Sequence, residues 1–324
     1  MNLSRRRFIE YCGVVAGAIG LTPGDLAGLN EALANPNAPE VIWMHGSSCT
    51  GCSVSLLNRI SNAVGEPPTV VEVLTGAINL THHQTLMSFA GESCGAVLEH
   101  AAKKGNYILV VEGGVPTAFN GHCCIAYSYK GQEVTFADAV AEMAQHAIAV
   151  VCVGTCSSFG GIPGAGSNPS GVVSVAAHTG ASTINISGCP SNPDWVVWAI
   201  VQLLTGATVV LDNDSRPVAL YQQTGTGGGG GGGSTVWEKI HQSCPRKTAY
   251  NTGNKAADFD ETVGKCLVDL GCRGQWTNAK CDSCWNGIAE EANWCIGVNS
   301  PCIGCVEPDF PGTQSFFKPY ISGS

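Results

Sequence analysis

The chain has 324 residues, of which 44% are apolar and 13% are charged, so it is long enough for two domains and a sizeable core. Its formal net charge of −9, without any basic stripe along the sequence, excludes a nucleic-acid partner, because nothing would neutralise the phosphates. The 17 cysteines are too sparse for a small disulfide scaffold, and their odd number excludes complete pairing.

Residues 1–34 are predicted to form a twin-arginine signal peptide. Arg5 and Arg6 precede a short apolar stretch, and Ala32-Leu33-Ala34 has the small-x-small form of a signal-peptidase site. The apolar stretch is too short to span a bilayer, which disfavours the alternative of a membrane anchor. The twin-arginine pathway exports folded proteins, often with metal cofactors installed. We therefore expect a periplasmic protein, soluble or peripheral to the membrane, whose cysteines meet iron in the reducing cytoplasm.

Residues 35–222 alternate short β-branched runs with amphipathic helical stretches. The expected strands are 41–44, 70–74, 107–111, 148–153, 183–187 and 208–211. The expected helices are 52–63, 84–103, 135–146 and 193–204. This alternation predicts an α/β, flavodoxin-like domain with a doubly wound parallel sheet, covered by helices on both faces. No G-x-G-x-x-G fingerprint follows a strand, so no dinucleotide is indicated.

Cysteines follow three of the expected strands. Cys49 and Cys52 come after the first run, and Cys156 and Cys189 come after two later runs. Ligands of an open parallel sheet bind beyond the carboxyl ends of its strands, so these four thiolates should converge on one point, as in a 4Fe-4S site. Glu112 follows a fourth run and is either a buried carboxylate near that site or a cap for backbone amides.

Residues 223–236 are predicted to be a flexible insertion, because they include seven consecutive glycines, each of which loses much backbone entropy on ordering. In residues 237–324 the strand pattern disappears, and four of the seven tryptophans and many cysteines occur there. We expect a small, irregular C-terminal domain that is stabilised in part by metal clusters.

This C-terminal region has its own cysteine motifs. In order they are His241-Gln-Ser-Cys244, Cys266-Leu-Val-Asp-Leu-Gly-Cys272 and Cys302-Ile-Gly-Cys305, with Cys281, Cys284 and Cys295 between the last two. A C-x-x-C pair places two thiolates on one turn, a spacing that zinc ribbons, redox dithiols and iron-sulfur sites share. Alone, each motif is weak evidence.

Taken together with the first set, these motifs closely resemble the small subunit of nickel-iron hydrogenases, in particular the periplasmic types that include the nickel-iron-selenium branch. The resemblance covers nearly the whole chain. It implies an electron-transfer subunit that relays electrons from hydrogen oxidation, at the nickel-iron centre of a separate large subunit, to an external acceptor. The implied acceptor is a redox protein such as a multihaem cytochrome c, or a membrane quinone-reducing module.

Carried over by position, the resemblance implies three 4Fe-4S clusters in this chain. The implied proximal ligands are Cys49, Cys52, Cys156 and Cys189. The implied distal ligands are His241, Cys244, Cys266 and Cys272. The implied medial ligands are Cys281, Cys295, Cys302 and Cys305. Many family members have proline near position 295 and lack a fourth thiolate there, so Cys295 favours a medial 4Fe-4S cluster over the alternative 3Fe-4S cluster.

Several assignments stay open at this point. The spacing before Trp285 differs from that of the family, so Cys284 is the alternative to Cys281 as a medial ligand. Cys152 lies in an apolar strand pattern and is expected to be a small buried hydrophobe. Three cysteines of the first domain remain, and they are Cys94, Cys123 and Cys124. They are either an additional redox pair or unmodified thiols.

Two other classes of protein are compatible with parts of the sequence. A quinone-reductase relative would share the first-domain cluster, but it should lack the whole set from His241 to Cys305. An exported cysteine-rich binding protein would be held together by disulfides and would contain no iron.

Overall fold

The structure is a computed structural model that describes residues 40–58, 70, 74, 78–221, 223–225, 236–281 and 294–319. The expected signal peptide, most of the glycine-rich segment and Cys284 lie outside the described residues. Within the described ranges, no helix combines the length and the apolar character needed to cross a membrane.

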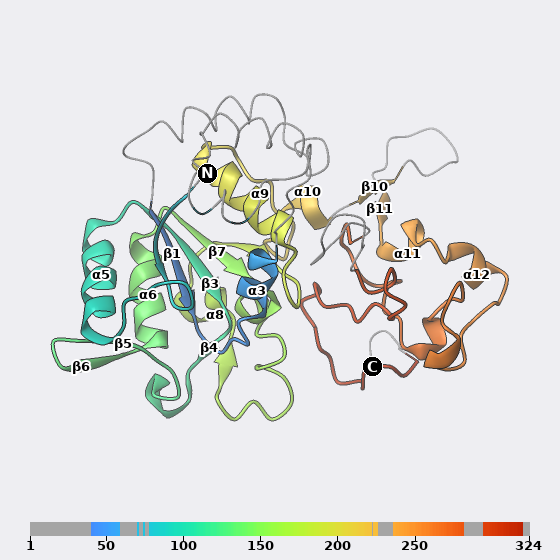
Figure 1. Cartoon of the computed structure of the whole chain (residues 1–324), viewed down its shortest axis with the longest axis horizontal. Helices are drawn as coiled ribbons and strands as arrows, with labels where there is room; N and C mark the ends of the chain where they lie inside the picture. The colour runs from blue at the N-terminus through green and yellow to red at the C-terminus, as the bar shows by residue number, and fades with distance from the viewer. Residues whose placement is uncertain are drawn as a thin grey trace.

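The first part of the chain is built on a five-stranded parallel sheet (Figure 1). Its strands are β1 (Glu40–His45), β2 (Asn79–His83), β3 (Tyr107–Glu112), β7 (Ala149–Val153) and β9 (Thr183–Ile186). Their order across the sheet is β2-β1-β3-β7-β9, and every neighbouring pair is parallel. This is the flavodoxin-like order, with its topological switch between β1 and β3. The predicted α/β fold class is confirmed.

Helices cover both faces of the sheet (Figure 1). One face carries α3 (Gly51–Leu57) and α9 (Pro193–Leu204), and the other carries α5 (Gly91–Lys104), α6 (Phe136–His146) and α8 (Val175–Thr179). Trp43 and Val110 belong to the core beneath α3 and α9, whereas Ile42 and Leu109 belong to the core beneath α5 and α6. Successive strand residues thus face opposite layers, and both layers are apolar because both faces are covered.

Most of the expected elements of this sheet are present. Four expected strands are present as β1, β3, β7 and β9, and none of their ends is shifted by more than one residue. The helices expected at 135–146 and 193–204 are α6 and α9. Helix α9 begins where the sequence indicates, because the Asn192 side chain accepts a 2.9 Å hydrogen bond from the backbone N–H of Asp194, and Pro193 occupies the first turn.

Two expected strands are wrong. Val70 and Leu74 are helical where a strand was expected, and residues 71–73 lie outside the described part. Residues 208–211 form only a single bridge, between Leu211 and Pro217. The strand beside β1 at one edge of the sheet is β2, which was not predicted. Its sequence, Asn-Leu-Thr-His-His, does not alternate apolar and polar residues, because its two buried positions are histidines.

Two helices begin or end differently from the expectation. The helix expected at 84–103 begins only at Gly91, because residues 84–87 form a turn closed by a hydrogen bond from the Met87 N–H to the His83 carbonyl oxygen. Of the helix expected at 52–63, the described part is α3, which ends at Leu57.

Several short elements in the first part were not predicted. They are β4 (Val115–Pro116), η2 (Ala118–Gly121), β5 (Ile125–Tyr129), β6 (Gln132–Thr135), α7 (Thr155–Phe159) and β8 (Val172–Val173). Strands β5 and β6 form a hairpin whose turn residues, Lys130 and Gly131, have φ of 50° and 73°, as a tight hairpin turn requires. Strand β4 pairs with β8 beside the sheet.

The C-terminal part is irregular, as predicted. Its described elements, with the short helix that leads into it, are α10 (Val218–Tyr221), β10 (Gln223–Gly225), β11 (Val236–Glu238), α11 (Ile240–Ser243), α12 (Lys247–Asn251), η3 (Phe259–Glu261) and η4 (Val268–Leu270). It packs beside the carboxyl ends of β7 and β9 (Figure 1). There the Ser187 hydroxyl donates a 2.8 Å hydrogen bond to the Val306 carbonyl oxygen.

Candidate functional site

The four cysteines of the first part lie beyond the carboxyl ends of the sheet strands. Cys49 precedes α3, Cys52 lies in its first turn, Cys156 lies in α7 directly after β7, and Cys189 follows β9. Burial, Glu112 and the neighbouring Cys156 and Cys189 raise the pKa of Cys52. Burial and then Cys49 raise the pKa of Cys189, so all four thiols lie within electrostatic range of one another. The structure brings the expected proximal set together.

The backbone around these thiols leaves room for sulfur. Gly154 has φ of 95°, and a Cβ at this position would lie 2.7 Å from Sγ of Cys52. Gly161 has φ of 54°, and a Cβ there would lie 3.1 Å from Sγ of Cys156. Glycine is required at both positions by the close approach and by the positive φ. The donor set and its cradle fit a thiolate-bound iron-sulfur cluster.

Glu112 lies at the end of β3 and contacts the first turn of α3. Its side chain is 2% exposed, and its carboxylate accepts hydrogen bonds from the backbone N–H groups of Cys52 and Ser53, both at 3.1 Å. It also accepts from the hydroxyl of Ser53 at 2.5 Å and from the indole N–H of Trp43 at 3.2 Å. Both roles considered for Glu112 are therefore present, since it is a buried carboxylate beside the cysteines and a cap for backbone amides.

Two buried histidines, His45 and His83, lie beside this carboxylate and Ser53, and the buried His82 lies near Cys94. His83 Nε2 lies 3.2 Å from the Ser53 hydroxyl, and His45 Nε2 lies 3.6 Å from the Glu112 carboxylate. Burial and then the nearby His45 lower the pKa of His82 to about 4 and that of His83 to about 3, so both are neutral at pH 7. All three are buried core histidines.

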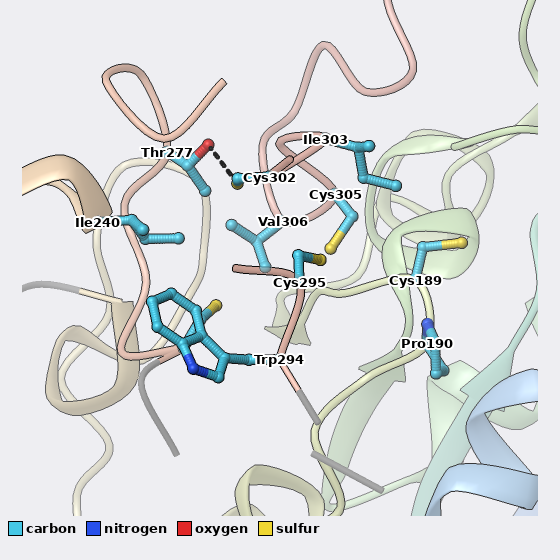
Figure 2. A pocket seen from close by; sticks show the side chains of 11 residues that line it. Cys189, Pro190, Ile240, Thr277, Trp294, Cys295, Cys302, Ile303, Cys305 and Val306 are labelled. Carbon is cyan, nitrogen blue, oxygen red and sulfur yellow. Dashed lines mark hydrogen bonds between the residues drawn. The ribbon is translucent and has the colours of Figure 1, made fainter. Parts of the chain in front are cut away.

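The expected medial set lines one cavity of about 130 Å³. Five cysteines line it, and they are Cys281, Cys295, Cys302 and Cys305 of the expected medial set together with Cys189 of the proximal set. Figure 2 shows the residues that line the cavity, with Trp294 and Ile303 at opposite sides of the view and Val306 between them. Cys281 is buried and takes part in this lining, whereas Cys284 lies outside the described residues, so the choice of Cys281 over Cys284 stays a prediction.

Burial disfavours the thiolate form of these cysteines when no metal is bound. It raises the pKa of Cys302 well above its usual value, and it raises the pKa of Cys305 to about 12. A buried thiolate without a cation is costly, whereas metal binding deprotonates thiols and balances their charge. The chemistry of this donor set therefore fits a metal cluster.

The expected distal set lines a second, smaller cavity of about 20 Å³. Its sulfur and imidazole donors are His241, Cys244, Cys266 and Cys272. Burial and then Lys247 lower the pKa of His241, which keeps the imidazole neutral and able to bind a metal at pH 7. The ring of His241 packs edge-on against Tyr250, with centroids 4.5 Å apart.

Neighbouring sets touch through backbone amides. The backbone N–H of Cys189 lies close enough to Sγ of Cys305 to lower its pKa, which places the first set beside the medial set. The backbone N–H of Cys302 donates to Sγ of Cys272, which joins the medial set to the distal set. Hydrogen bonds to sulfur favour the thiolate form.

Other cysteines lie apart from these sets. Cys152 is fully buried in β7, as expected, and Cys94 is buried 3.7 Å from Nδ1 of His82. Cys123 is exposed beside the half-buried Cys124, and none of the cysteines in the described ranges forms a disulfide. Over the same ranges, no three His, Cys, Asp or Glu side chains are close enough to hold a single metal ion.

A buried arginine near the medial set was not predicted from the sequence. Arg216 is 5% exposed and forms ion pairs with Asp212 at 3.0 Å, Asp214 at 3.1 Å and Glu307 at 3.3 Å. It also donates to the Val306 carbonyl oxygen at 3.2 Å. The pattern Asp-x-Asp-x-Arg was the available signal, but Glu307 lies 91 residues away in the sequence.

Two family models match the chain. The model of the NADH ubiquinone oxidoreductase 20 Kd subunit matches residues 49–203, and the model of the C-terminal region of the NiFe/NiFeSe hydrogenase small subunit matches residues 237–318. The chain is 37% identical to the periplasmic [NiFeSe] hydrogenase small subunit of Desulfomicrobium baculatum, over 98% of this chain and 99% of that protein. It is 34% identical to the periplasmic [NiFe] hydrogenase small subunit of Solidesulfovibrio fructosivorans, over 98% and 93% of the two chains.

Solved structures agree with these similarities. The recombinant [NiFeSe] hydrogenase from Desulfovibrio vulgaris Hildenborough superposes with a TM-score of 0.74 at 37% identity, covering 86% of this chain and 97% of that chain. The reduced, active Ni-Fe-Se hydrogenase from Desulfomicrobium baculatum gives a TM-score of 0.73 at the same identity, covering 87% and 99%.

Proposed function

Because this chain belongs to the family of nickel-iron and nickel-iron-selenium hydrogenase small subunits, we propose that it relays electrons through three iron-sulfur clusters to an external acceptor. The electrons come from hydrogen oxidation at a nickel-iron centre on a partner large subunit. The acceptor is a redox protein, such as a multihaem cytochrome c, or a membrane quinone-reducing module.

The grouping of the donors carries this proposal. The proximal ligands are Cys49, Cys52, Cys156 and Cys189, the medial ligands are Cys281, Cys295, Cys302 and Cys305, and the distal ligands are His241, Cys244, Cys266 and Cys272. Such clusters supply one-electron transfer. The contacts from Cys189 to Cys305 and from Cys302 to Cys272 support a relay, since they join ligands of successive sites.

The chain's own residues hold the clusters, exclude water and tune the sites. The medial thiols are buried among Trp294, Ile303 and Val306, which keeps solvent away from the middle of the relay. His241 replaces one thiolate at the distal site with a neutral ligand, and a less negative ligand set favours the reduced state at the exit point.

The domain division and the export route belong to the same proposal. Residues 1–34 form a twin-arginine signal peptide, 35–222 the flavodoxin-like domain, 223–236 the glycine-rich insertion and 237–324 the domain of the medial and distal clusters. The two family models match on either side of the insertion, which supports this division. Several relatives are named as periplasmic hydrogenase subunits, which supports export to the periplasm.

Iron and acid-labile sulfide in the complex with the co-purified large subunit test the proposal. Three 4Fe-4S clusters predict about twelve iron atoms per chain. Replacement of Cys156 by Ser should lower this number, whereas Cys152→Ser, at a buried thiol outside all three sets, should not. A parent complex without sulfide, or without hydrogen-driven dye reduction, would contradict the proposed function.

A quinone-reductase type of subunit is the second candidate, favoured by the family match over residues 49–203. That class would use the first cluster alone. The donor sets that line the two C-terminal cavities have no role in it. Iron near four atoms per chain would favour this candidate over the hydrogenase subunit.

A further inference from the structure

Thr155 joins segments that belong to two different cluster sites. It is 1% exposed at the start of α7, directly before the proximal cysteine Cys156. Its hydroxyl accepts a 2.9 Å hydrogen bond from the backbone N–H of Gly188, next to Cys189, and donates to the backbone carbonyl oxygen of Cys305. One hydroxyl therefore connects both proximal segments to the medial loop.

The same side chain lies beside the contact between the two sites. The backbone N–H of Cys189 lies close enough to Sγ of Cys305 to lower its pKa, while the sulfur of Cys189 points away from the medial thiols in Figure 2. Cys189 thus faces the proximal site with its side chain and the medial site with its backbone. Thr155 binds Gly188 on one side of this contact and Cys305 on the other.

We propose that Thr155 is a positioning residue that holds Cys305 against Cys189 and thereby sets the rate of electron transfer between the proximal and medial sites. The proposal rests on the proposed function. The step is the transfer of one electron from the reduced proximal site to the oxidised medial site, and no bond forms or breaks.

Other contacts between the two parts do not duplicate this one. Ser187 holds the loop one residue further along, through its hydrogen bond to the Val306 carbonyl oxygen. Arg216 donates to that same oxygen. Among the described residues, neither the Ser187 nor the Arg216 side chain forms hydrogen bonds to both Gly188 and Cys305. The distance between Cys189 and Cys305 therefore depends most directly on Thr155.

Substitutions in the assembled complex separate positioning from folding. Thr155→Val keeps the branched shape but lacks the hydroxyl, and Thr155→Ser keeps the hydroxyl. The matched control is Ser158→Ala, because Ser158 is a buried hydroxyl of the same helix whose hydrogen bond, 2.9 Å to the Gly154 carbonyl oxygen, is purely local. Each complex is assayed for iron content, hydrogen-deuterium exchange, hydrogen-driven dye reduction and the magnetic coupling between reduced proximal and medial signals in electron paramagnetic resonance.

In Thr155→Val we expect parental iron and exchange, weaker magnetic coupling, and dye reduction lowered several-fold, because electron transfer between two sites slows as the distance between them grows. Thr155→Ser and Ser158→Ala should match the parent in all four measurements. Parental coupling and dye reduction in an iron-replete Thr155→Val complex would overturn the proposal.

Thr155→Ser provides a second test if Thr155→Val assembles poorly. The hydroxyl alone carries the bridge, so a several-fold loss of dye reduction in an iron-replete Thr155→Ser complex would also overturn the positioning role. Failure of the proposed function gives a different result, because the parent complex itself would then lack iron-sulfur signals or hydrogen-driven dye reduction.

Discussion

The carboxylate of Glu112 accepts the backbone N–H of Cys52 at 3.1 Å, although the two residues lie 60 positions apart in the sequence. This hydrogen bond fixes the first turn of α3 against the end of β3. It also brings a negative charge to the thiols, and that charge, after burial, raises the pKa of Cys52. Glu112 therefore positions the proximal site and opposes the addition of further negative charge to it.

Replacing Glu112 should weaken the fold and shift the potential of the proximal site. Glu112→Gln loses a charge-assisted acceptor for buried donors, so we expect about 2 kcal/mol lower stability. Loss of a negative charge should also make the proximal reduction potential less negative. Chemical denaturation and a redox titration measure the two effects. Glu92→Gln is the control, since Glu92 also accepts two backbone N–H groups, at 2.7 and 2.9 Å, but at an exposed turn.

Arg216 should be essential for stability. Arg216→Met removes the cation that pairs with both Asp212 and Glu307, and both of these acids are largely buried. Burial already raises the pKa of Glu307, so the loss of Arg216 leaves it still less favourable as an anion. Breaking a buried ion pair costs about 3–5 kcal/mol, which urea unfolding would detect. Lys104→Met, at an exposed pair with Glu40, should cost less than about 1 kcal/mol, and equal losses would contradict the argument.

The strands of the sheet could be predicted from the sequence where they have a recognisable local pattern of apolar residues. Residues 107–111 and 148–153 are apolar runs because helices cover both faces of these strands, and such runs are visible in the sequence. Strand β2 was missed because its buried residues, His82 and His83, are polar. Their burial depends on tertiary partners such as Ser53, 30 residues from His83, and no local pattern reports that contact.

For the site, too, local motifs could be recognised in the sequence, whereas contacts between distant residues could not. The cysteines could be found because each follows a strand or lies in a short motif. Their connections could not, since Thr155 and Cys305 are 150 residues apart, and Arg216 and Glu307 are 91 apart. A threonine and an arginine acquire these roles only when the C-terminal part packs against the sheet.

The buried histidines should make stability depend on pH. The folded-state pKa of His83 is about 3, below the usual value of 6.5, so the unfolded chain takes up the proton first as the pH falls. The contribution of neutral, buried His83 to the stability of the fold is then fully present above about pH 6.5 and is lost as the pH falls toward about 3. Between pH 7.5 and 5.5 we expect His83 to contribute a loss of about 1 kcal/mol. Thermal unfolding should show a weaker pH dependence for His83→Gln and an unchanged one for the exposed His122→Gln.

His241 should matter for electron exit and not for hydrogen activation. His241→Ala removes the imidazole from the distal set, while the proposed catalytic centre lies on the other subunit. We expect hydrogen-driven dye reduction to fall at least about tenfold while hydrogen-deuterium exchange stays at the parental level, because loss of a direct ligand should cost at least as much as loss of a residue that hydrogen-bonds a ligand, which costs about 10- to 100-fold. His146→Ala, at an exposed helix end, is the control. An equal loss of both activities in an intact complex would remove the distal assignment.

The fourth medial ligand can be identified by single substitutions. Cys281 lines the medial cavity with the other three cysteines, so Cys281→Ser should open the cluster, because serine is a poor substitute for a thiolate ligand. We expect iron to fall from about twelve to about eleven atoms or fewer per chain, with a three-iron signal in electron paramagnetic resonance. Cys284→Ser should behave like the parent, since a spare thiol holds no iron. The reverse pattern would show that Cys284 is the ligand and that Cys281 only contributes to the lining of the cavity.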